Sequence, residues 1–279
     1  MRPARSTGVA GRASIRHMEL ESGQHERFAR DGYLLLPALF GPEQLDGFEQ
    51  RFLALVQGDV PAGEDLVIMR DVMVAQGAVE PKTPLHAVNK ILSFEDDEVL
   101  FAYACDARLL SVVRSLIGPR VMTISTNLFN KPPGVDGRHP LHQDLRYFAL
   151  RPEESIVGTW TAMGPVTRDN GCLSVIPGSH RAGLLNHLAP DWEYLNGGFF
   201  AAEGVDLDQR VHLEMQPGDT LFLHPLLLHG SGRNRSSDFR RAISVHFASQ
   251  ECVRPPGRRS RAPVIRKIDG PEEGGPEPA

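Results

Sequence analysis

The feature that most constrains the fold of this chain is a series of short β-like runs between about residues 120 and 250. Apolar and β-branched residues dominate each run, as in VMTISTNLF (121–129), SIVGTWTAM (155–163) and RAISVHFAS (241–249). Turn signals separate the runs, among them RDNG, PGSH and QPGD. Regularly spaced short strands of this kind predict a β-sandwich, a barrel or a jelly roll.

Helical patterns precede the strands. Residues 20–32 predict a helix that leads into a short strand at 33–37, and residues 95–117 predict two further helical stretches. In GPEQLDGFEQRFLALV (41–56), apolar residues recur at helical spacing and a proline lies near the start, where it is tolerated. Helices first and strands after predict an α+β fold, mainly β in its core, with the helices packed on one sheet face.

The chain has 279 residues, and we expect one domain over residues 19–253. Residues 1–18 are expected to form a disordered leader, and Met18 is hypothesised to be the true start. Residues 254–279 are rich in proline, glycine and charge, so a disordered tail is expected there.

Charge and cysteine usage exclude several classes of protein. A net charge of −5 argues against a nucleic-acid or anionic-membrane partner. No apolar run approaches the roughly 18 residues of a membrane helix. Cys105, Cys172 and Cys252 are far apart and form no CxxC pair, so a disulfide scaffold or a thiolate zinc site is not expected and a reducing compartment fits better.

The stretch HPLHQDLRYF (139–148) carries the first candidate metal ligands. On a strand, residues i and i+2 share a face, so His142 and Asp144 would project together while Gln143 points away. A histidine and a carboxylate supply two ligands, and a second histidine would complete the facial triad of non-haem Fe(II) oxygenases. His139 is interpreted as a loop residue. Taken alone, the motif fits a solvated polar turn better.

The third ligand has several candidates, namely His180, His212, His224, His229 and His246. His229 ends the apolar run in DTLFLHPLLLHGSG (219–232) at a glycine-rich turn, where a side chain can face a cavity. His224 lies in the same run and is the close rival, although Pro225 indicates a bend. For both, a buried structural histidine is an equal alternative.

Arg240 begins FRRAISVHF (239–247), eleven residues after His229. If Ile243, Val245 and Phe247 pack beneath the helices, the alternate set faces the interior and Arg241 lies on the other face. That interior set is Arg240, Ala242, Ser244 and His246. A buried guanidinium needs an anion, which is either an internal Asp or Glu or the distal carboxylate of 2-oxoglutarate.

Together these motifs resemble the phytanoyl-CoA dioxygenase family, and most closely its phytanoyl-CoA 2-hydroxylase branch. The resemblance extends over about residues 26–253 and includes NKPP, HPLHQDL, WTAM, NGCL, PGSH, GDT, HPLLLHGSG and FRRAISVHFAS. It implies a double-stranded β-helix (jelly-roll) core that binds Fe(II) and 2-oxoglutarate, with O2 as second co-substrate. Ascorbate can serve such enzymes as an auxiliary reductant.

The resemblance also implies roles for individual residues. The iron ligands would be His142, Asp144 and His229, and Arg240 would anchor 2-oxoglutarate. Further co-substrate contacts would come from Lys90, Trp160, Gln143 and Asn127. Strand parity points the Gln143 side chain away, so a backbone contact is expected there. Asn127 matches a position that is apolar in relatives. Without the resemblance, Lys90 would be read as a surface charge and Trp160 as core packing.

The implied reaction is hydroxylation of an aliphatic carbon, at C2 of a branched fatty acyl-CoA in α-oxidation. The alternatives are the same chemistry on another small molecule, such as a secondary metabolite or free acid, and a non-catalytic metal-binding jelly roll. A zinc hydrolase lacks support because no HExxH motif is present. Coenzyme A phosphates could meet Arg138, Arg146 or Arg151, whereas residues 254–261 are interpreted as a solvated basic tail. Composition favours a cytoplasmic, bacterial-like protein, and the resemblance offers a peroxisomal alternative.

Overall fold

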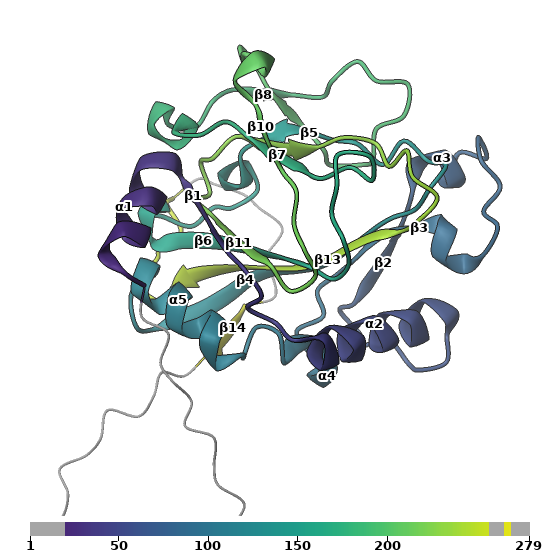
Figure 1. The fold of residues 1–279 in the computed structure, drawn as a ribbon, viewed down its shortest axis with the longest axis horizontal. Helices are drawn as coiled ribbons and strands as arrows, with labels where there is room; N and C mark the ends of the chain where they lie inside the picture. The colour runs from purple at the N-terminus through teal and green to yellow at the C-terminus, as the bar shows by residue number, and fades with distance from the viewer. Residues whose placement is uncertain (1–19, 257–264, 269–279) are drawn as a thin grey trace, which may run out of the picture.

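The computed structural model describes residues 20–256 and 265–268, and two β-sheets form its core (Figure 1). The larger sheet has the order β1-β11-β6-β13-β4-β3-β2, and β14 pairs with β4 beside it. Its strands are β1 (Tyr33–Leu36), β2 (Val67–Arg70), β3 (Val88–Leu92), β4 (Val121–Lys131), β6 (Ile156–Ala162), β11 (Thr220–Leu223), β13 (Arg240–Ser249) and β14 (Arg266–Ile268).

The smaller sheet lies above the larger one in Figure 1 and has the order β10-β7-β12-β5. Its strands are β5 (His139–His142), β7 (Leu173–Val175), β10 (Val211–Leu213) and β12 (His229–Ser231). A separate ribbon joins β8 (His187–Leu188) to β9 (Ala201–Ala202). Strands distant in sequence are neighbours in both sheets and pair antiparallel, which is the arrangement of a jelly roll.

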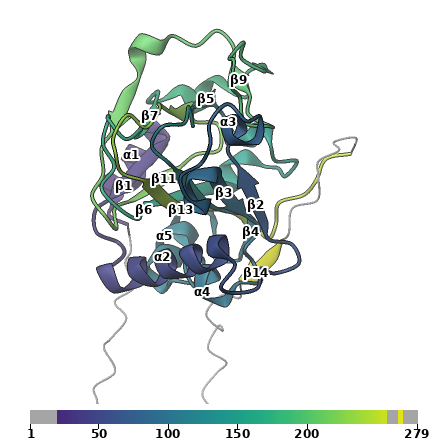
Figure 2. The same ribbon diagram turned by 90° about the vertical axis from the view of Figure 1, so that its right-hand side faces the viewer.

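The helices gather mainly on one side of the larger sheet. They are α1 (Ser22–Asp31), α2 (Pro42–Gln57), α3 (Val72–Ala75), α4 (Glu98–Phe101) and α5 (Ala107–Ile117). Figure 2 shows α2, α4 and α5 below the larger sheet, on the side away from the smaller sheet. Short 3-10 turns cover Pro84–Ala87, Asp144–Arg146, Glu153–Ser155, Ser179–Ala182 and Leu207–Gln209. The smaller sheet therefore faces the side of the larger sheet that these helices leave free.

Helix α2 forms where the apolar spacing predicted it. Its buried residues are Leu45, Phe48, Phe52 and Leu55. Pro42 occupies the first turn and Gly58, with φ 81°, ends the helix in a left-handed conformation that favours glycine. Burying a side chain of this size contributes about 1.5–3 kcal/mol, so the apolar stripe holds α2 on the core.

Strand β13 has the two faces that alternation predicted. Ile243, Val245 and Phe247 are fully buried and belong to the apolar cluster that contains the helix residues. On the opposite face, Arg240, Ser244 and His246 line an internal pocket. Residues that fix the helices and residues that line the pocket therefore alternate along one strand.

The C-terminal region differs from the disordered tail expected over residues 254–279. Arg266–Ile268 form β14, which pairs with β4 through Ile268 and Val121. Ile268 is buried, and the Arg266 guanidinium lies 4.3 Å from the Phe101 ring and donates to the Glu95 carbonyl, so side-chain contacts hold the segment together with the ladder bonds. The expected leader at 1–18, and the rest of the tail beyond residue 256, lie outside the described residues. Within the described part of the chain, no helix has the length and apolarity that crossing a membrane requires.

Candidate active site

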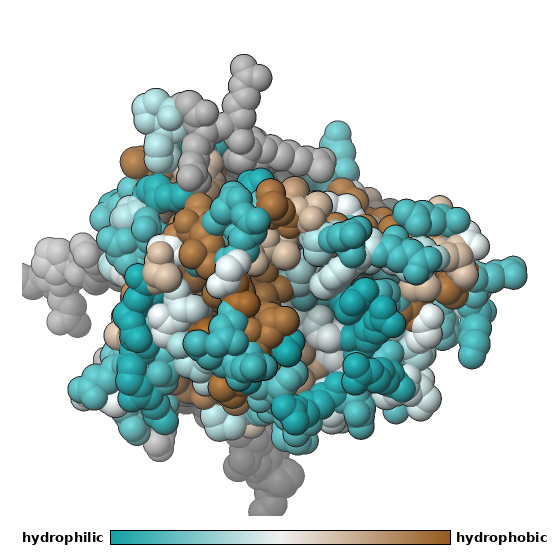
Figure 3. All heavy atoms as spheres, turned by 90° about the horizontal axis from the view of Figure 1, so that it is seen from above, coloured by the Kyte–Doolittle hydropathy of each residue, from teal (hydrophilic) through white to brown (hydrophobic). Residues whose placement is uncertain are grey.

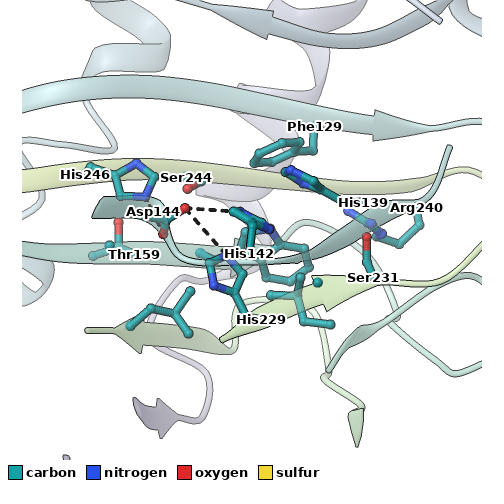
Figure 4. Close-up of a pocket in the computed structure, with 15 residues that line it drawn as sticks. Phe129, His139, His142, Asp144, Thr159, His229, Ser231, Arg240, Ser244 and His246 are labelled. Carbon is teal, nitrogen blue, oxygen red and sulfur yellow. Dashed lines mark hydrogen bonds and ion pairs between the residues drawn. The ribbon is translucent and has the colours of Figure 1, made fainter. Parts of the chain in front are cut away.

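Three side chains from separate elements meet in the pocket between the sheets (Figure 4). His142 ends β5, Asp144 opens the turn Asp144–Arg146, and His229 begins β12. The Nε2 atoms of His142 and His229 lie 3.3 Å and 3.7 Å from Asp144 Oδ1. All three residues are buried, and their candidate ligand atoms lie within 4.8 Å of one another. Such a group can hold one divalent metal ion.

The local backbone differs from the predicted continuous strand. Pairing ends at His142, and Asp144 lies in a helical turn rather than two positions further along a strand. The side chains of His142 and Asp144 nonetheless converge, while the Gln143 side chain points elsewhere. The antiparallel register then sets His229 directly opposite His142.

Backbone carbonyls orient both imidazoles. His142 Nδ1 lies 2.8 Å from the carbonyl of Pro140, and His229 Nδ1 lies 3.1 Å from that of Leu227. A neutral imidazole that donates Nδ1–H in this way presents the lone pair of Nε2 to the pocket, as metal-ligating histidines do. Burial lowers the pKa of His229 to about 4, which keeps that ring neutral. The donor set thus fits a metal cation.

Asp144 is held as a carboxylate. Burial alone would raise its pKa, but His229 and His246 together hold the pKa well below the usual range. Its second oxygen, Oδ2, lies 2.9 Å from His246 Nε2 on β13. One oxygen therefore faces the two other candidate ligands while the second is fixed from the larger sheet.

At the other end of the pocket lies the guanidinium of Arg240 (Figure 4). It is 3% exposed, and Nη2 donates to the Gly171 carbonyl at 3.2 Å, while Nε has no hydrogen-bond partner in the part of the chain that the structure describes. Its guanidinium carbon lies 5.4 Å from the Trp160 ring. Among the described residues no carboxylate pairs with it, so the internal Asp or Glu alternative fails. An unpaired buried charge costs on the order of several kcal/mol, which an incoming anion would offset.

Two lysines flank this end of the pocket. The amine of Lys90 lies 5.4 Å and 5.3 Å from the Phe129 and Phe199 rings, and burial lowers its pKa to about 8. Lys131 is buried and donates to Ser231 Oγ at 2.8 Å, and burial followed by the charge of Arg240 holds its pKa well below the usual range. Burial thus weakens the positive charge of both lysines, whereas Arg240, whose pKa burial lowers only to about 10, stays charged at neutral pH and supplies the main positive charge at this end.

Some predicted residues do not reach the pocket. The Gln143 amide donates to the carbonyls of Gly183 and Leu226, and its backbone N–H donates to His187. Asn127 donates to Ser125 Oγ and is absent from the pocket lining, although its cross-strand partner Ser244 lines the pocket.

The rival histidines also lie elsewhere. His180 contacts the carbonyl of Ala29, and His224 accepts a hydrogen bond from the backbone of Leu226. His212 is on β10, outside the pocket lining.

Other pocket residues were not identified from the sequence. His139, interpreted as a loop residue, instead begins β5 and stacks on His142 with ring centroids 4.1 Å apart. Ser231 and Lys131 also border the pocket region. Ser231 lies two residues after His229 on β12, Lys131 lies two residues after Phe129 on β4, and both His229 and Phe129 line the pocket. Because residues i and i+2 of a strand share a face, the alternation that starts from His229 and Phe129 could have predicted Ser231 and Lys131 as pocket residues.

The jelly roll and this pocket define an enzyme class, that of the Fe(II)- and 2-oxoglutarate-dependent dioxygenases. Solved structures of similar fold include EctD from S. alaskensis, with a TM-score of 0.64 and 21% identity over 86% of this chain and 80% of that one. EvdO2 from Micromonospora carbonacea, solved with 2-oxoglutarate, has a TM-score of 0.63 and 20% sequence identity. The match covers 86% of this chain and 94% of that one. The predicted α+β jelly-roll fold is confirmed.

The sequence comparison gives the family. The pattern of the phytanoyl-CoA dioxygenase (PhyH) family matches residues 28–242. A probable phytanoyl-CoA dioxygenase from Caenorhabditis elegans is 42% identical over 84% of this chain and 77% of its own length. The peroxisomal phytanoyl-CoA dioxygenases of Bos taurus and Homo sapiens are 42% and 40% identical, each over 82% of this chain and 68% of theirs. The chain belongs to the phytanoyl-CoA dioxygenase family.

Proposed function

We propose that this enzyme hydroxylates C2 of a branched fatty acyl-CoA such as phytanoyl-CoA, with His142, Asp144 and His229 as iron ligands. One observation carries the proposal: the histidine–carboxylate group lies at one end of a pocket, and the other end holds a buried guanidinium that has no carboxylate partner within residues 20–256 and 265–268. The names of relatives with 40–42% identity supply the substrate class.

Each residue has a defined task in this proposal. Bound iron with 2-oxoglutarate supplies oxidative decarboxylation and insertion of one O2 oxygen into a C–H bond. Arg240 binds the distal carboxylate of 2-oxoglutarate through charge-assisted hydrogen bonds, and the Trp160 face keeps the guanidinium in place. Lys90 does not line this pocket, but its amine lies 5.4 Å from the ring of Phe129, which does, and adds a positive charge beside it.

The pocket also orients the proposed ligands and fixes the tautomer of both histidines. The carbonyls of Pro140 and Leu227 hold the two imidazoles in one tautomer and orientation. His246 keeps Asp144 from rotating. Positioning of this kind is the protein's principal contribution to such chemistry.

A direct experiment tests the substrate. The purified enzyme is incubated with phytanoyl-CoA, 2-oxoglutarate, Fe(II) and O2, and the product is identified by mass together with succinate release. A 2-hydroxyacyl-CoA formed in step with succinate supports the proposal. Succinate released without that product shows the same chemistry on another small molecule. No succinate with any substrate of an acyl-CoA and free-acid panel would favour a non-catalytic metal-binding protein.

The proposal takes residues 19–253 as one catalytic domain, because the larger sheet draws strands from Tyr33–Leu36 through to Arg240–Ser249 and the strands of the smaller sheet lie between these in the sequence. We also propose that the enzyme acts in the cytoplasm, as its composition favours, with the peroxisome of the mammalian relatives as the alternative. Subcellular fractionation of the native source, followed by immunodetection of the chain, distinguishes the two compartments.

A further inference from the structure

A second cavity, of about 880 Å³, lies on the outer face of the smaller sheet, and none of the three candidate metal ligands lines it. Ser174, His212 and Gly230 line it, whereas their strand neighbours Leu173 and Leu213 belong to the apolar cluster on the inner side. Parts of the segment between residues 190 and 210 complete its wall. Its volume is in the range of small-molecule sites.

The lining of this cavity is strongly basic, although the whole chain is acidic. It contains five arginines and one carboxylate, Asp169. The arginines are Arg138, Arg168, Arg210, Arg233 and Arg235. Arginines concentrated around one concave surface favour binding of a polyanion.

Most of this charge is not neutralised within the protein. Asp136 pairs with Arg138 at 2.5 Å and with Arg233 at 3.0 Å, so one carboxylate serves two guanidiniums. Arg168, Arg210 and Arg235 form no ion pair with any residue in the described ranges 20–256 and 265–268. These three positive charges remain available to a ligand.

Two acidic residues of the covering segment, Glu203 and Asp206, are engaged elsewhere. Asp206 accepts hydrogen bonds from the backbone of Asp208 and from the Gln209 amide, both at 3.0 Å. Glu203 bonds to Asn186. Neither of these carboxylates lines the cavity, so they leave its charge unbalanced.

An aromatic surface lies beside the arginines. The guanidinium carbon of Arg138 is 4.0 Å from the centre of the Trp192 ring, and both residues line the cavity. An indole next to cations suits a ligand that combines phosphates with a planar base. Of the three arginines suggested by the sequence, Arg146 instead stacks on Phe200 and Arg151 donates to nearby carbonyls.

The basic cavity and the metal pocket adjoin. His139, Gly230 and Ser231 border both, and His139 lies on β5, the edge strand of the smaller sheet. A ligand held in the cavity by its phosphates could therefore extend a flexible arm around this edge. Figure 3 views the molecule from this side, where hydrophilic residues surround apolar ones near the middle. The exposed apolar residues of the neighbouring segments are Leu184, Leu188, Leu207 and Val211.

We propose that this cavity binds the phosphate-bearing, nucleotide end of the coenzyme A thioester, with Arg168, Arg210 and Arg235 on the phosphates and Trp192 beside the base. The assignment rests on the proposed acyl-CoA substrate and adds the site that recognises it. Guanidinium groups bind phosphate bidentately, which gives the arginines a specific role beyond their charge.

The first test measures binding directly. Coenzyme A and adenosine 3′,5′-bisphosphate are titrated calorimetrically into the full chain and into an Arg168→Ala/Arg235→Ala variant. We expect the variant to bind both probes about tenfold more weakly or worse, with a reduced salt dependence. The matched control is Arg27→Ala/Arg120→Ala, which removes two exposed arginines remote from the cavity. Undiminished binding in the cavity variant, or no binding by the wild type, would overturn the proposal.

The second test separates substrate recognition from binding of a free nucleotide. We expect the cavity variant to raise KM for the acyl-CoA substrate about tenfold, while KM for 2-oxoglutarate stays unchanged. An unchanged acyl-CoA KM in a variant that has lost coenzyme A binding would assign the cavity to a free nucleotide and contradict us. A wild type that binds coenzyme A through this cavity but hydroxylates no acyl-CoA would instead contradict the proposed function alone.

Discussion

The Nε2 atom of His246 lies 2.9 Å from Oδ2 of Asp144, across the pocket from the two histidines that face Oδ1. His246 belongs to β13 in the larger sheet, whereas His142 and His229 belong to the smaller sheet. Histidines from both sheets thus contact the Asp144 carboxylate, so the orientation of the carboxylate depends on the distance between the sheets.

Replacement of His246 by alanine should weaken metal binding. Loss of the hydrogen bond leaves Asp144 free to rotate, and removal of such an outer partner weakens metal affinity about 10- to 100-fold. Titration with Fe(II) under anaerobic conditions, or with Mn(II) by electron paramagnetic resonance, measures the change. His246→Gln retains a donor and should recover part of the affinity. Wild-type affinity in His246→Ala would show that the contact has no positioning role.

Substitution of Asp144 by alanine should abolish succinate formation. The change removes the carboxylate from the proposed triad and leaves only the two imidazoles. Succinate release in the presence of 2-oxoglutarate is the measurement, and circular dichroism checks that the variant folds. Unimpaired turnover would overturn the iron assignment.

Arg240 and Arg241 provide a matched pair on opposite faces of β13. Arg240→Met should raise KM for 2-oxoglutarate at least about 30-fold, because a buried charge that loses its partner costs about 2–5 kcal/mol of binding. The same change should raise the free energy of unfolding without ligands by about 1 kcal/mol or more, since it removes an unpaired buried charge.

Arg241→Met is the control for that experiment. Arg241 pairs with Glu49 on α2, so its loss should lower stability and leave KM for 2-oxoglutarate unchanged. Equal effects of the two substitutions on KM would contradict the anchor role of Arg240. Chemical denaturation and steady-state kinetics provide the two measurements.

The affinity for 2-oxoglutarate should fall as the pH rises past about 8. Burial lowers the pKa of Lys90 to about 8, so the amine is charged below this pH and becomes neutral above it. A carboxylate prefers the charged amine, so the contribution of Lys90 to binding is complete at lower pH and is lost at higher pH. Binding measured from pH 6.5 to 9.5 should lose this dependence in Lys90→Met. A variant with the wild-type pH profile would exclude Lys90 as its source.

Local alternation predicted much of the site. The alternation of strand residues alone predicted that Arg240 faces the pocket and Arg241 does not. The i, i+2 spacing predicted that the side chains of His142 and Asp144 converge, and they do so although the strand ends at His142. Selection of His229 over His224 required the family resemblance, because no local signal shows which strand pairs with β5.

Longer-range features could not be derived in that way. Lys131 reaches Ser231 across the two sheets, a contact between residues 100 positions apart that periodicity does not encode. The pairing of β14 with β4 depends on a short segment with one buried residue, which composition placed in a tail. The basic cavity likewise gathers arginines from loops and strand ends, whose meeting depends on the complete fold.

Strand β13 has a consequence for how substitutions outside the pocket should act. Its residues alternate between contacts with the helical layer and contacts with the ligand-binding space. A cavity or an overpacked side chain beneath Val245 or Phe247 would shift the backbone that carries Arg240 and His246. Inherited or engineered changes in the helical layer should therefore reduce the coupling of co-substrate consumption to product formation while the protein remains folded.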